Sequence, residues 1–365
     1  MADWLSSMQQ TYEYYTVDPV TWKDDKLLEY VTSCTINRDS TAETLGSATL
    51  DITEPIDEVY IRIYLVTIQN GVKEKHPLGT FLAQTPSSGF DGKVKSISVD
   101  AYTPLLELKE KRPSLGYSIL KPYVGSDGKM ANDEPIMNFV YRLTDEHARA
   151  KVVPVDHDKK LTNSFVANAD DTWLKFLSDL MANAKYKFDL DEMGRIMFKP
   201  DQETAKLQPV WTYNDDNSSI LQPDVTINRD MYGIPNVVEV IYSNVDKLKK
   251  FYSKKVNDDP NSPTSTVNRG REIVQRITDP TFVGVPSQEE VEEYAERVLK
   301  EASTIEYSVT YTHGYCPVRV GDCVMLNYSR AGLKHIKAKV VSQSIKCEPG
   351  CQVTEKVVFT AELWR

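Results

Sequence analysis

The sequence holds few side chains whose type and spacing suit catalysis, and its five histidines are the first to consider. They are scattered, and none is followed by another four residues later, the spacing that binds zinc on one face of a helix. His157 stands between Asp156 and Asp158, and neighbouring carboxylates can orient an imidazole. The surrounding segment is strongly polar, so we expect a solvated loop there and no catalytic base.

Four of the five cysteines could supply thiolates to a zinc ion: Cys316, Cys323, Cys347 and Cys351. Structural zinc sites usually bring their ligands in pairs that are two to four residues apart. Only Cys347 and Cys351 approach this spacing, whereas Cys316 and Cys323 are too far apart. We therefore expect these cysteines to be small buried strand residues.

The sequence lacks phosphate-binding and hydrolytic motifs. The segment Gly125–Met130 places a lysine after a glycine but departs from the P-loop pattern, so we expect a turn. A Gly-x-Ser-x-Gly elbow does not occur. The pairs Asp215-Asp216 and Asp258-Asp259 lie in polar segments, where a raised carboxyl pKa is not expected. The sequence therefore predicts no catalytic residue, no cofactor and no metal.

The pentapeptide Thr-Ile-Asn-Arg-Asp occurs twice in the chain. Its copies are Thr35, Ile36, Asn37, Arg38, Asp39 and Thr226, Ile227, Asn228, Arg229, Asp230. A turn and an alternating apolar strand follow each copy, at 48–52 and at 237–241. Such repetition is typical of a duplicated supersecondary unit. We interpret the copies as equivalent positions in two β modules, and as candidate interface residues.

The elements that must position these residues are mostly strands. Alternating apolar residues predict strands at 59–65 and 94–99, and later at 307–311, 318–320, 323–327, 338–344 and 353–362. Between the two strand-rich stretches, the pattern predicts helices from Pro135 to about Asp145 and from Trp173 to Ala184, and a hairpin around Gly194. Ser287 and Glu290 form a capping box that predicts a helix over 288–303. The fold class is α+β, mainly β.

A polar segment interrupts the second strand-rich stretch. Residues 257–266 include two prolines and no apolar residue. Such composition cannot bury enough apolar surface to order a segment. We expect an exposed, mobile loop that orders only against a partner chain.

Composition limits the classes of function. The chain has 365 residues, of which 41% are hydrophobic, so it can build two or three cores. Its net charge is −10 and it has no long basic run, so a phosphate-gripping surface is not indicated. The N-terminus does not read as a signal peptide, and no apolar run reaches the length of a membrane span. An odd number of cysteines then indicates reduced thiols and synthesis in a cytoplasm.

Several segments of the chain resemble the baseplate hub proteins of tailed bacteriophages and phage-tail-like particles. They are the run 259–265, the segment Arg269-Gly270-Arg271-Glu272, the helix at 289–302 and the segment 319–326, in which Gly321-Asp322 precedes a strand. Residues 173–177 with the hairpin around Gly194 are similar to the inserted α+β domain of that family, and 237–242 to a barrel strand. None of these segments is a catalytic signature.

The resemblance implies two related, tail-tube-like β-barrel domains with an inserted α+β domain. The first barrel would span residues 1–104 and the insertion 105–205. The second barrel would span 206–365, with a polar loop at 253–286 and the helix at 288–303.

The resemblance also implies a homotrimer that joins a sixfold tail tube to a threefold spike at the tail tip. Partners would be the tail tube or distal tail protein, the central spike or tip protein, the tape measure protein and other baseplate proteins. DNA would pass through without specific binding, and stable membrane insertion is not expected. The chain would be synthesised in the cytoplasm of the bacterial host and end in the particle's tail tip.

Two alternatives remain open. The chain could be another tail component, such as a distal-tail or receptor-binding protein, although no repetitive or lectin-like region is visible. It could also be a hydrolase of cell-wall material. A peptidoglycan assay on the purified chain separates the second alternative from a structural role.

Overall fold

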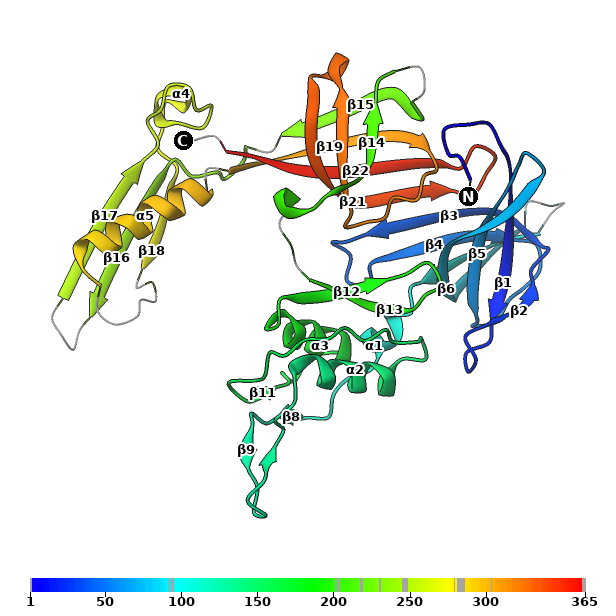
Figure 1. Cartoon of the computed structure of the whole chain (residues 1–365), viewed down its shortest axis with the longest axis horizontal. Helices are drawn as coiled ribbons and strands as arrows, with labels where there is room; N and C mark the ends of the chain where they lie inside the picture. The colour runs from blue at the N-terminus through cyan, green and yellow to red at the C-terminus, as the bar shows by residue number, and fades with distance from the viewer. Residues whose placement is uncertain are drawn as a thin grey trace. The chain divides into compact units, whose positions relative to one another are not determined.

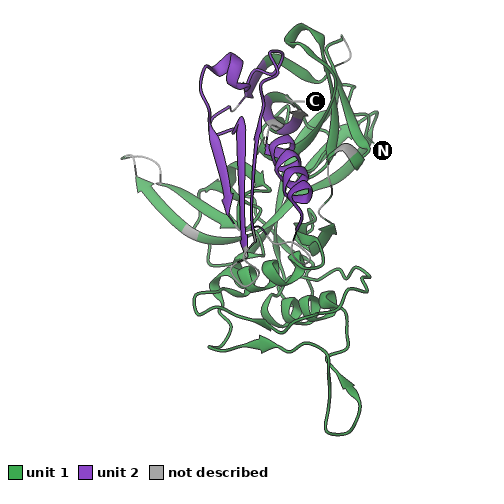
Figure 2. Ribbon diagram, turned by 90° about the vertical axis from the view of Figure 1, so that its left-hand side faces the viewer, with its two compact units in different colours: residues 1–224, 311–356 green, residues 225–310, 357–365 purple. Residues whose placement is uncertain are grey.

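The computed structural model describes residues 2–90, 92, 95–200, 202, 204–216, 219–229, 231–244, 249–278, 280, 286–302 and 304–362. Strands dominate the chain, and helices are few (Figure 1). Two compact units can be distinguished (Figure 2). Unit 1 comprises Met1–Asp224 and Tyr311–Lys356, and unit 2 comprises Val225–Thr310 and Val357–Arg365. The mainly β class predicted from the sequence is confirmed.

Strands from both ends of the sequence form one large sheet. Its order is β15, β19, β22, β21, β3, β4, β7, β6, β5, β1, β2, and β20 links β14 to β21. The bounds are β1 (Gln9–Val17), β2 (Asp24–Leu27), β3 (Val31–Asp39), β4 (Gly46–Ile52), β5 (Tyr60–Gln69), β6 (Val72–Phe90), β7 (Lys95–Tyr102), β14 (Pro209–Asn214), β15 (Leu221–Arg229), β19 (Thr304–Gly314), β20 (Cys323–Tyr328), β21 (Leu333–Lys346) and β22 (Gln352–Glu362). Short 3₁₀ turns, η1 (Thr204–Lys206) and η2 (Ser329–Ala331), flank β14 and β20.

The antiparallel pair β3–β21 joins the N-terminal strands to the C-terminal strands. Ile36 lies opposite Ile345 in this pair, and both side chains are buried. On its other side β3 pairs with β4, where Ala48, Leu50 and Ile52 alternate with more exposed residues. Since side chains alternate across a strand, this period of two buries one face in an apolar core.

Residues 106–200 contain three helices and several short strands. They are α1 (Leu106–Glu110), β8 (Ser118–Ile119), β9 (Tyr123–Val124), β10 (Met130–Ala131), α2 (Ile136–His147), β11 (Phe165–Val166), α3 (Trp173–Ala182), β12 (Tyr186–Leu190) and β13 (Ile196–Pro200). Thr172 begins α3 by accepting a hydrogen bond from the Lys175 amide. Trp173, Leu177 and Leu180 bury the apolar stripe of α3 in a shared core. The predicted helices and hairpin are therefore found, with ends that differ by a few residues.

Unit 2 contains a small sheet covered by one helix. The sheet order is β17 (Lys249–Val256), β16 (Val237–Asn244), β18 (Val274–Thr278), and α5 (Gln288–Ala302) packs on it. Val238 and Val240 share a core with the apolar stripe of α5. The predicted capping box is present, because the Glu290 amide donates to Ser287 Oγ and the Ser287 amide donates to the Glu290 carboxylate.

The prediction of an exposed loop at 257–266 is wrong for four of its residues, which are buried, whereas Asp258, Pro260, Asn261 and Pro263 are exposed. Asn257, Ser262 and Thr264 are buried and hydrogen-bonded to one another, and Ser265 begins the short helix α4 (Thr266–Arg269). The amide side chain of Asn236 donates to the carbonyls of Thr264 and Arg271. Polar side chains that satisfy each other can therefore order a segment without an apolar core.

Two further expectations differ from the structure. Residues 318–320 do not form a strand, because the Arg319 amide donates to the Asp322 carboxylate and turns the chain. Residues 237–242 lie in β16 and pair with β17 and β18, so the strand that follows the second pentapeptide is not in the large sheet. The first pentapeptide, by contrast, is followed by its own partner, β4.

The two β-barrel domains and the domain boundaries at residues 104 and 205 stay predictions. Among the described residues, the strand pairing does not close into a barrel. In the described part of the chain, no helix combines the length and the apolar character that a membrane span requires.

Candidate functional site

The hairpin β12–β13 docks on the large sheet through its turn, residues 190–194, which we call the docking turn (Figure 1). The turn closes because the Gly194 amide donates to the Asp191 carbonyl. Gly194 has φ +73°, a left-handed conformation that favours glycine. A Cβ at this position would stand 2.7 Å from Thr80 Cβ, so glycine also permits the close approach to β6.

Side chains from the large sheet and from its connecting segments bind the backbone of the docking turn. Arg62 Nη2 and Trp22 Nε1 both donate to the Met193 carbonyl, at 3.0 and 2.8 Å. Thr80 Oγ1 donates to the Glu192 carbonyl at 3.2 Å. Arg319 donates to the Leu190 carbonyl. These carbonyls are partly buried, and the hydrogen bonds from the surrounding side chains hold the turn in place.

Arg62 is the central residue of the docking turn's support. It extends from β5 and is 1% exposed. Its Nη1 forms an ion pair with Asp24 at 2.6 Å, and its Nε donates to Thr80 Oγ1 at 3.0 Å. A buried guanidinium is tolerated when its charge is paired and its donors are satisfied. The planar fork of arginine thus holds the sheet and the turn together.

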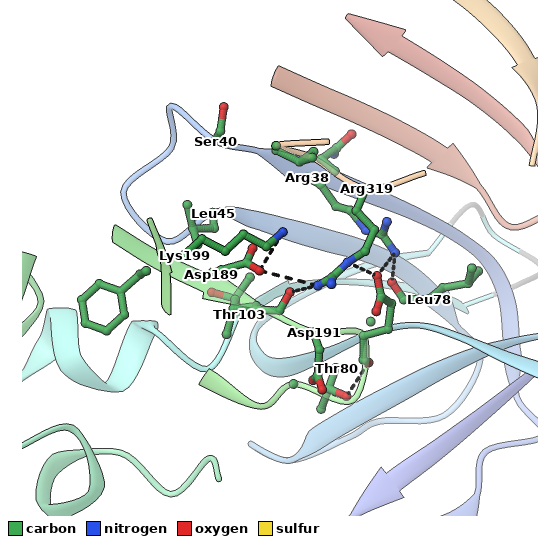
Figure 3. A pocket seen from close by; sticks show the side chains of 18 of the residues that line it. Arg38, Ser40, Leu45, Leu78, Thr80, Thr103, Asp189, Asp191, Lys199 and Arg319 are labelled. Atoms are coloured by element: carbon green, nitrogen blue, oxygen red, sulfur yellow. Dashed lines mark hydrogen bonds and ion pairs between the residues drawn. The ribbon is translucent and has the colours of Figure 1, made fainter. Parts of the chain in front are cut away.

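A second ionic cluster lies beside the turn, around a cavity of about 110 Å³ (Figure 3). Arg319 Nε is 2.8 Å from Glu192, and Lys199 Nζ is 2.9 Å from Asp189. Arg38 donates to the Leu78 carbonyl at 2.6 Å and lies 3.8 Å from the Glu192 carboxylate. Burial lowers the pKa of Arg319, but the carboxylates of Glu192 and Asp189 outweigh this effect and raise it.

The two pentapeptides occupy different environments. The first lies at the end of β3, between β21 and β4, and its Arg38 reaches the cavity. In the second, Thr226–Arg229 lies at the end of β15, where all four residues are exposed, and Asp230 falls outside the described residues. Among the described residues of the two copies, only those of the first contribute to the cavity beside the docking turn. Whether the copies are equivalent in two related domains stays a prediction.

A fully buried polar cluster continues inward from Arg38. Arg38 donates to Gln343 Oε1, and Gln343 Nε2 donates to the Glu355 carboxylate at 2.6 Å. His313 Nε2 lies 3.7 Å from Glu355 and 3.2 Å from the Tyr213 hydroxyl. Burial lowers the pKa of His313, but Cys316 and Glu355 outweigh it and raise the pKa to about 10.

This cluster contains a cysteine, a histidine and a carboxylate, the constituents of a nucleophilic triad. Cys316 Sγ lies 3.9 Å from His313 Nδ1 and 3.3 Å from the Tyr213 hydroxyl. His313 is 1% exposed and Glu355 is 0% exposed. A nucleophile must be reached by its substrate, and these side chains are enclosed. We therefore assign the cluster a structural role.

The other residues that the sequence singles out are not brought together. His157 lies in a loop and its Nδ1 accepts from the Lys159 amide. Gly125–Gly128 forms a turn, as expected, between β9 and β10. Asp215 pairs with Arg330, and Asp259 accepts from Asn261. All five cysteines are free and buried, and the described residues contain no group suited to hold a metal ion.

Sequence reasoning missed Arg62, Trp22, Thr80, His313 and Glu355. An arginine inside the apolar strand 60–66 is the one local signal, because a charged residue in such a run must have buried partners. The partners themselves lie on distant segments and left no local pattern.

No protein-family model matches the chain, and no curated protein matches it. Among solved structures, a tail protein from Neisseria meningitidis MC58 is similar, with a TM-score of 0.62 and 12% identity, over 97% of this chain and 98% of that one. The 43 kDa tail protein of prophage MuSo2 from Shewanella oneidensis has a TM-score of 0.59 and 11% identity, over 95% and 97%. A chain of the Francisella PdpA–VgrG complex has a TM-score of 0.56 and 9% identity, over 98% of this chain and 53% of that one. The chain therefore has the fold of phage tail proteins.

Proposed function

We propose that this chain is a structural hub at the tip of a phage or phage-like tail. The observation that carries the proposal is the likeness to the Neisseria tail protein over nearly the whole of both chains. A likeness that covers both chains end to end supports a shared place in a tail more strongly than one confined to a common module. The proposed location is the tail tip of the particle, after synthesis in the host cytoplasm.

In the proposed assembly three copies form a ring that adapts a sixfold tube to a threefold spike. The repeated pentapeptide supports this arrangement, because two related modules in each of three chains give six quasi-equivalent positions. The net charge of −10 is suited to a ring through which DNA slides without binding. The tail tube or distal tail protein, the spike or tip protein and the tape measure protein are the proposed neighbours.

The docking turn supports a structural role within such a ring. Trp22, Arg62 and Thr80 donate to its backbone carbonyls, and these hydrogen bonds hold the helical insertion on the sheet. A part that transmits force between a tube and a tip needs a rigid joint between its modules. We propose that the docking turn is this joint and that the chain is not an enzyme.

The experiment is made on the assembled particle. Quantitative mass spectrometry of purified tails should give three copies of this chain per tail, and cryo-electron microscopy should place them in one ring at the tip. A copy number of six, or a position on the outer fibres, would refute the hub. Hydrolysis of peptidoglycan by the isolated chain would favour the enzymatic alternative.

A further inference from the structure

Cys34 and Cys347 lie opposite one another across the β3–β21 pair. The register pairs Thr35 with Lys346, and the next residues outward are the two cysteines. The Cys347 amide donates to the Cys34 carbonyl at 2.9 Å. Directly opposed residues bonded in this way have Cα atoms about 5.5 Å apart, inside the range that a disulfide spans.

The two thiols also share one environment. Both belong to the same apolar cluster, with Cys34 4% and Cys347 9% exposed. The neighbouring Cys34 thiol, together with burial, raises the pKa of Cys347 above its ordinary value, and Arg38 opposes this shift. Opposed strand residues point to the same face of the sheet, so the sulfur atoms need no large backbone movement to meet.

The remaining cysteines have other partners. Cys351 lies in the same cluster, where the neighbouring Tyr12 hydroxyl partly opposes the rise that burial causes in the pKa of its thiol. Cys316 contacts Tyr213 and His313, and Cys323 donates to a backbone carbonyl on β20. The geometry thus selects one pair among the five thiols.

We propose that Cys34 and Cys347 form a redox pair, which closes to a disulfide when the protein meets a low-molecular-weight disulfide such as oxidised glutathione. Local opening of the chain just beyond β21 exposes Cys347, and its thiolate attacks one sulfur of the small disulfide and releases one small thiolate. The Cys34 thiol then loses its proton, attacks the Cys347 sulfur of the mixed disulfide and releases the second small thiol. The two cysteines lose two electrons, and the small disulfide is reduced to two thiols.

The bond would staple the N-terminal strands to the C-terminal strands. The disulfide would close a loop of about 300 residues, and long loops are where such a bond most restricts the unfolded chain. On the proposed function as a tail protein, the pair stays reduced in the cytoplasm and closes after the particle is released. The chemistry itself does not depend on that assignment.

The test uses the purified full chain with oxidised glutathione at about pH 8.5, near the ordinary thiol pKa. After unfolding and alkylation, the free thiols should fall from five to three, and peptide mapping should recover Cys34 joined to Cys347. The thermal midpoint should rise by about 3–8 °C and return on reduction.

Matched variants decide which thiols react. Cys347→Ser should keep all four remaining thiols, and Cys34→Ser should stop at a mixed disulfide between Cys347 and glutathione with three free thiols, whereas Cys323→Ser should still lose two. Five free thiols after oxidation, or a bond between Cys347 and Cys351, would overturn the proposal. If Cys34→Ser does not fold, the peptide map of the native chain decides alone. The copy number in tails is a separate measurement, so the redox pair and the hub can fail independently.

Discussion

Arg62 donates a hydrogen bond of 3.0 Å to the carbonyl oxygen of Met193, although 131 positions separate the two residues. This bond joins a strand of the large sheet to the docking turn. It depends on the side chain of one residue and only on the backbone of the other. The stability of the joint should therefore respond to changes at Arg62 far more than to changes at Met193.

Replacing Arg62 with alanine should lower the free energy of unfolding by about 2–4 kcal/mol. The change removes the ion pair that the buried guanidinium forms with Asp24, and it takes a donor from the carbonyls of Trp22 and Met193. Urea unfolding measures the effect. Arg142→Ala is the control, because Arg142 pairs with Glu134 near the surface and should cost less than about 1 kcal/mol. Equal losses for the two variants would contradict the role of Arg62.

Two glycines with the same backbone conformation allow the cost of backbone strain to be measured apart from the cost of a steric clash. Gly194 and Gly128 have φ +73° and +75°, but a Cβ would meet Thr80 only at Gly194 and open space at Gly128. Gly128→Ala should cost about 1 kcal/mol, the penalty of a left-handed alanine. Gly194→Ala should cost about 1–3 kcal/mol more, because it also overpacks the docking turn. Thermal unfolding of both variants checks the difference. Similar midpoints would show that the Thr80 side chain can move aside without a measurable loss of stability.

The two copies of the pentapeptide provide another matched pair. Arg38 binds Leu78, Gln343 and Glu192, whereas Arg229 is exposed. Arg38→Ala should destabilise the isolated chain by about 2–3 kcal/mol, and Arg229→Ala should stay within about 0.5 kcal/mol. If Arg229 is an interface residue, its variant should instead reduce the incorporation of the chain into tails. A stable Arg38→Ala chain would remove the structural role of the first copy.

Stability should decline on the alkaline side of neutrality because of His313. Its pKa is raised from 6.5 to about 10 in the folded chain, so the folded state holds a proton that the unfolded state releases. The contribution of His313 is complete below pH 6.5 and is lost as the pH rises toward 10. Between pH 6.5 and 9 we expect a loss of roughly 1–3 kcal/mol.

The control for this pH dependence is His313→Gln, which lacks the titrating group. The unfolding free energy of this variant should be lower than that of the unaltered chain at pH 6.5, and it should change less between pH 6.5 and pH 9. Above pH 9 both chains should weaken, because burial and neighbouring groups raise the pKa of Cys351 to about 12 and that of Tyr311 well above 10. Parallel curves between pH 6.5 and 9 would show that His313 carries no proton there.

Local patterns in the sequence were sufficient for local structure. The helix at 288–302 begins at Ser287 because the cap and its partner Glu290 are three residues apart, and this signal is readable without the fold. The docking turn has no such signal, because Arg62, Thr80 and Met193 meet only once the sheet has formed. Identical residues in the two pentapeptides also have different surroundings, so sequence identity alone did not reveal which arginine is bonded.

The error at 257–266 has a specific physical source. Counting apolar residues predicts disorder when a segment has none, and that rule assumes that polar side chains bond only to water. Asn236 and Asn257 instead bond to the protein backbone and to hydroxyl groups, inside a buried network. Which asparagines form such bonds depends on segments that are distant in the sequence but close in the fold, and a local window of the sequence does not contain them.

The pairing of β3 with β21 has a consequence for synthesis on the ribosome. About 300 residues separate Asp39 from Lys346. At a translation rate of roughly 5–20 residues per second, one edge of β3 therefore stays unpaired for roughly 15–60 s before β21 is synthesised. During that interval an apolar strand edge is open to other nascent chains. We expect truncated chains that end before β21 to be held by chaperones, and full-length chains to be released from them.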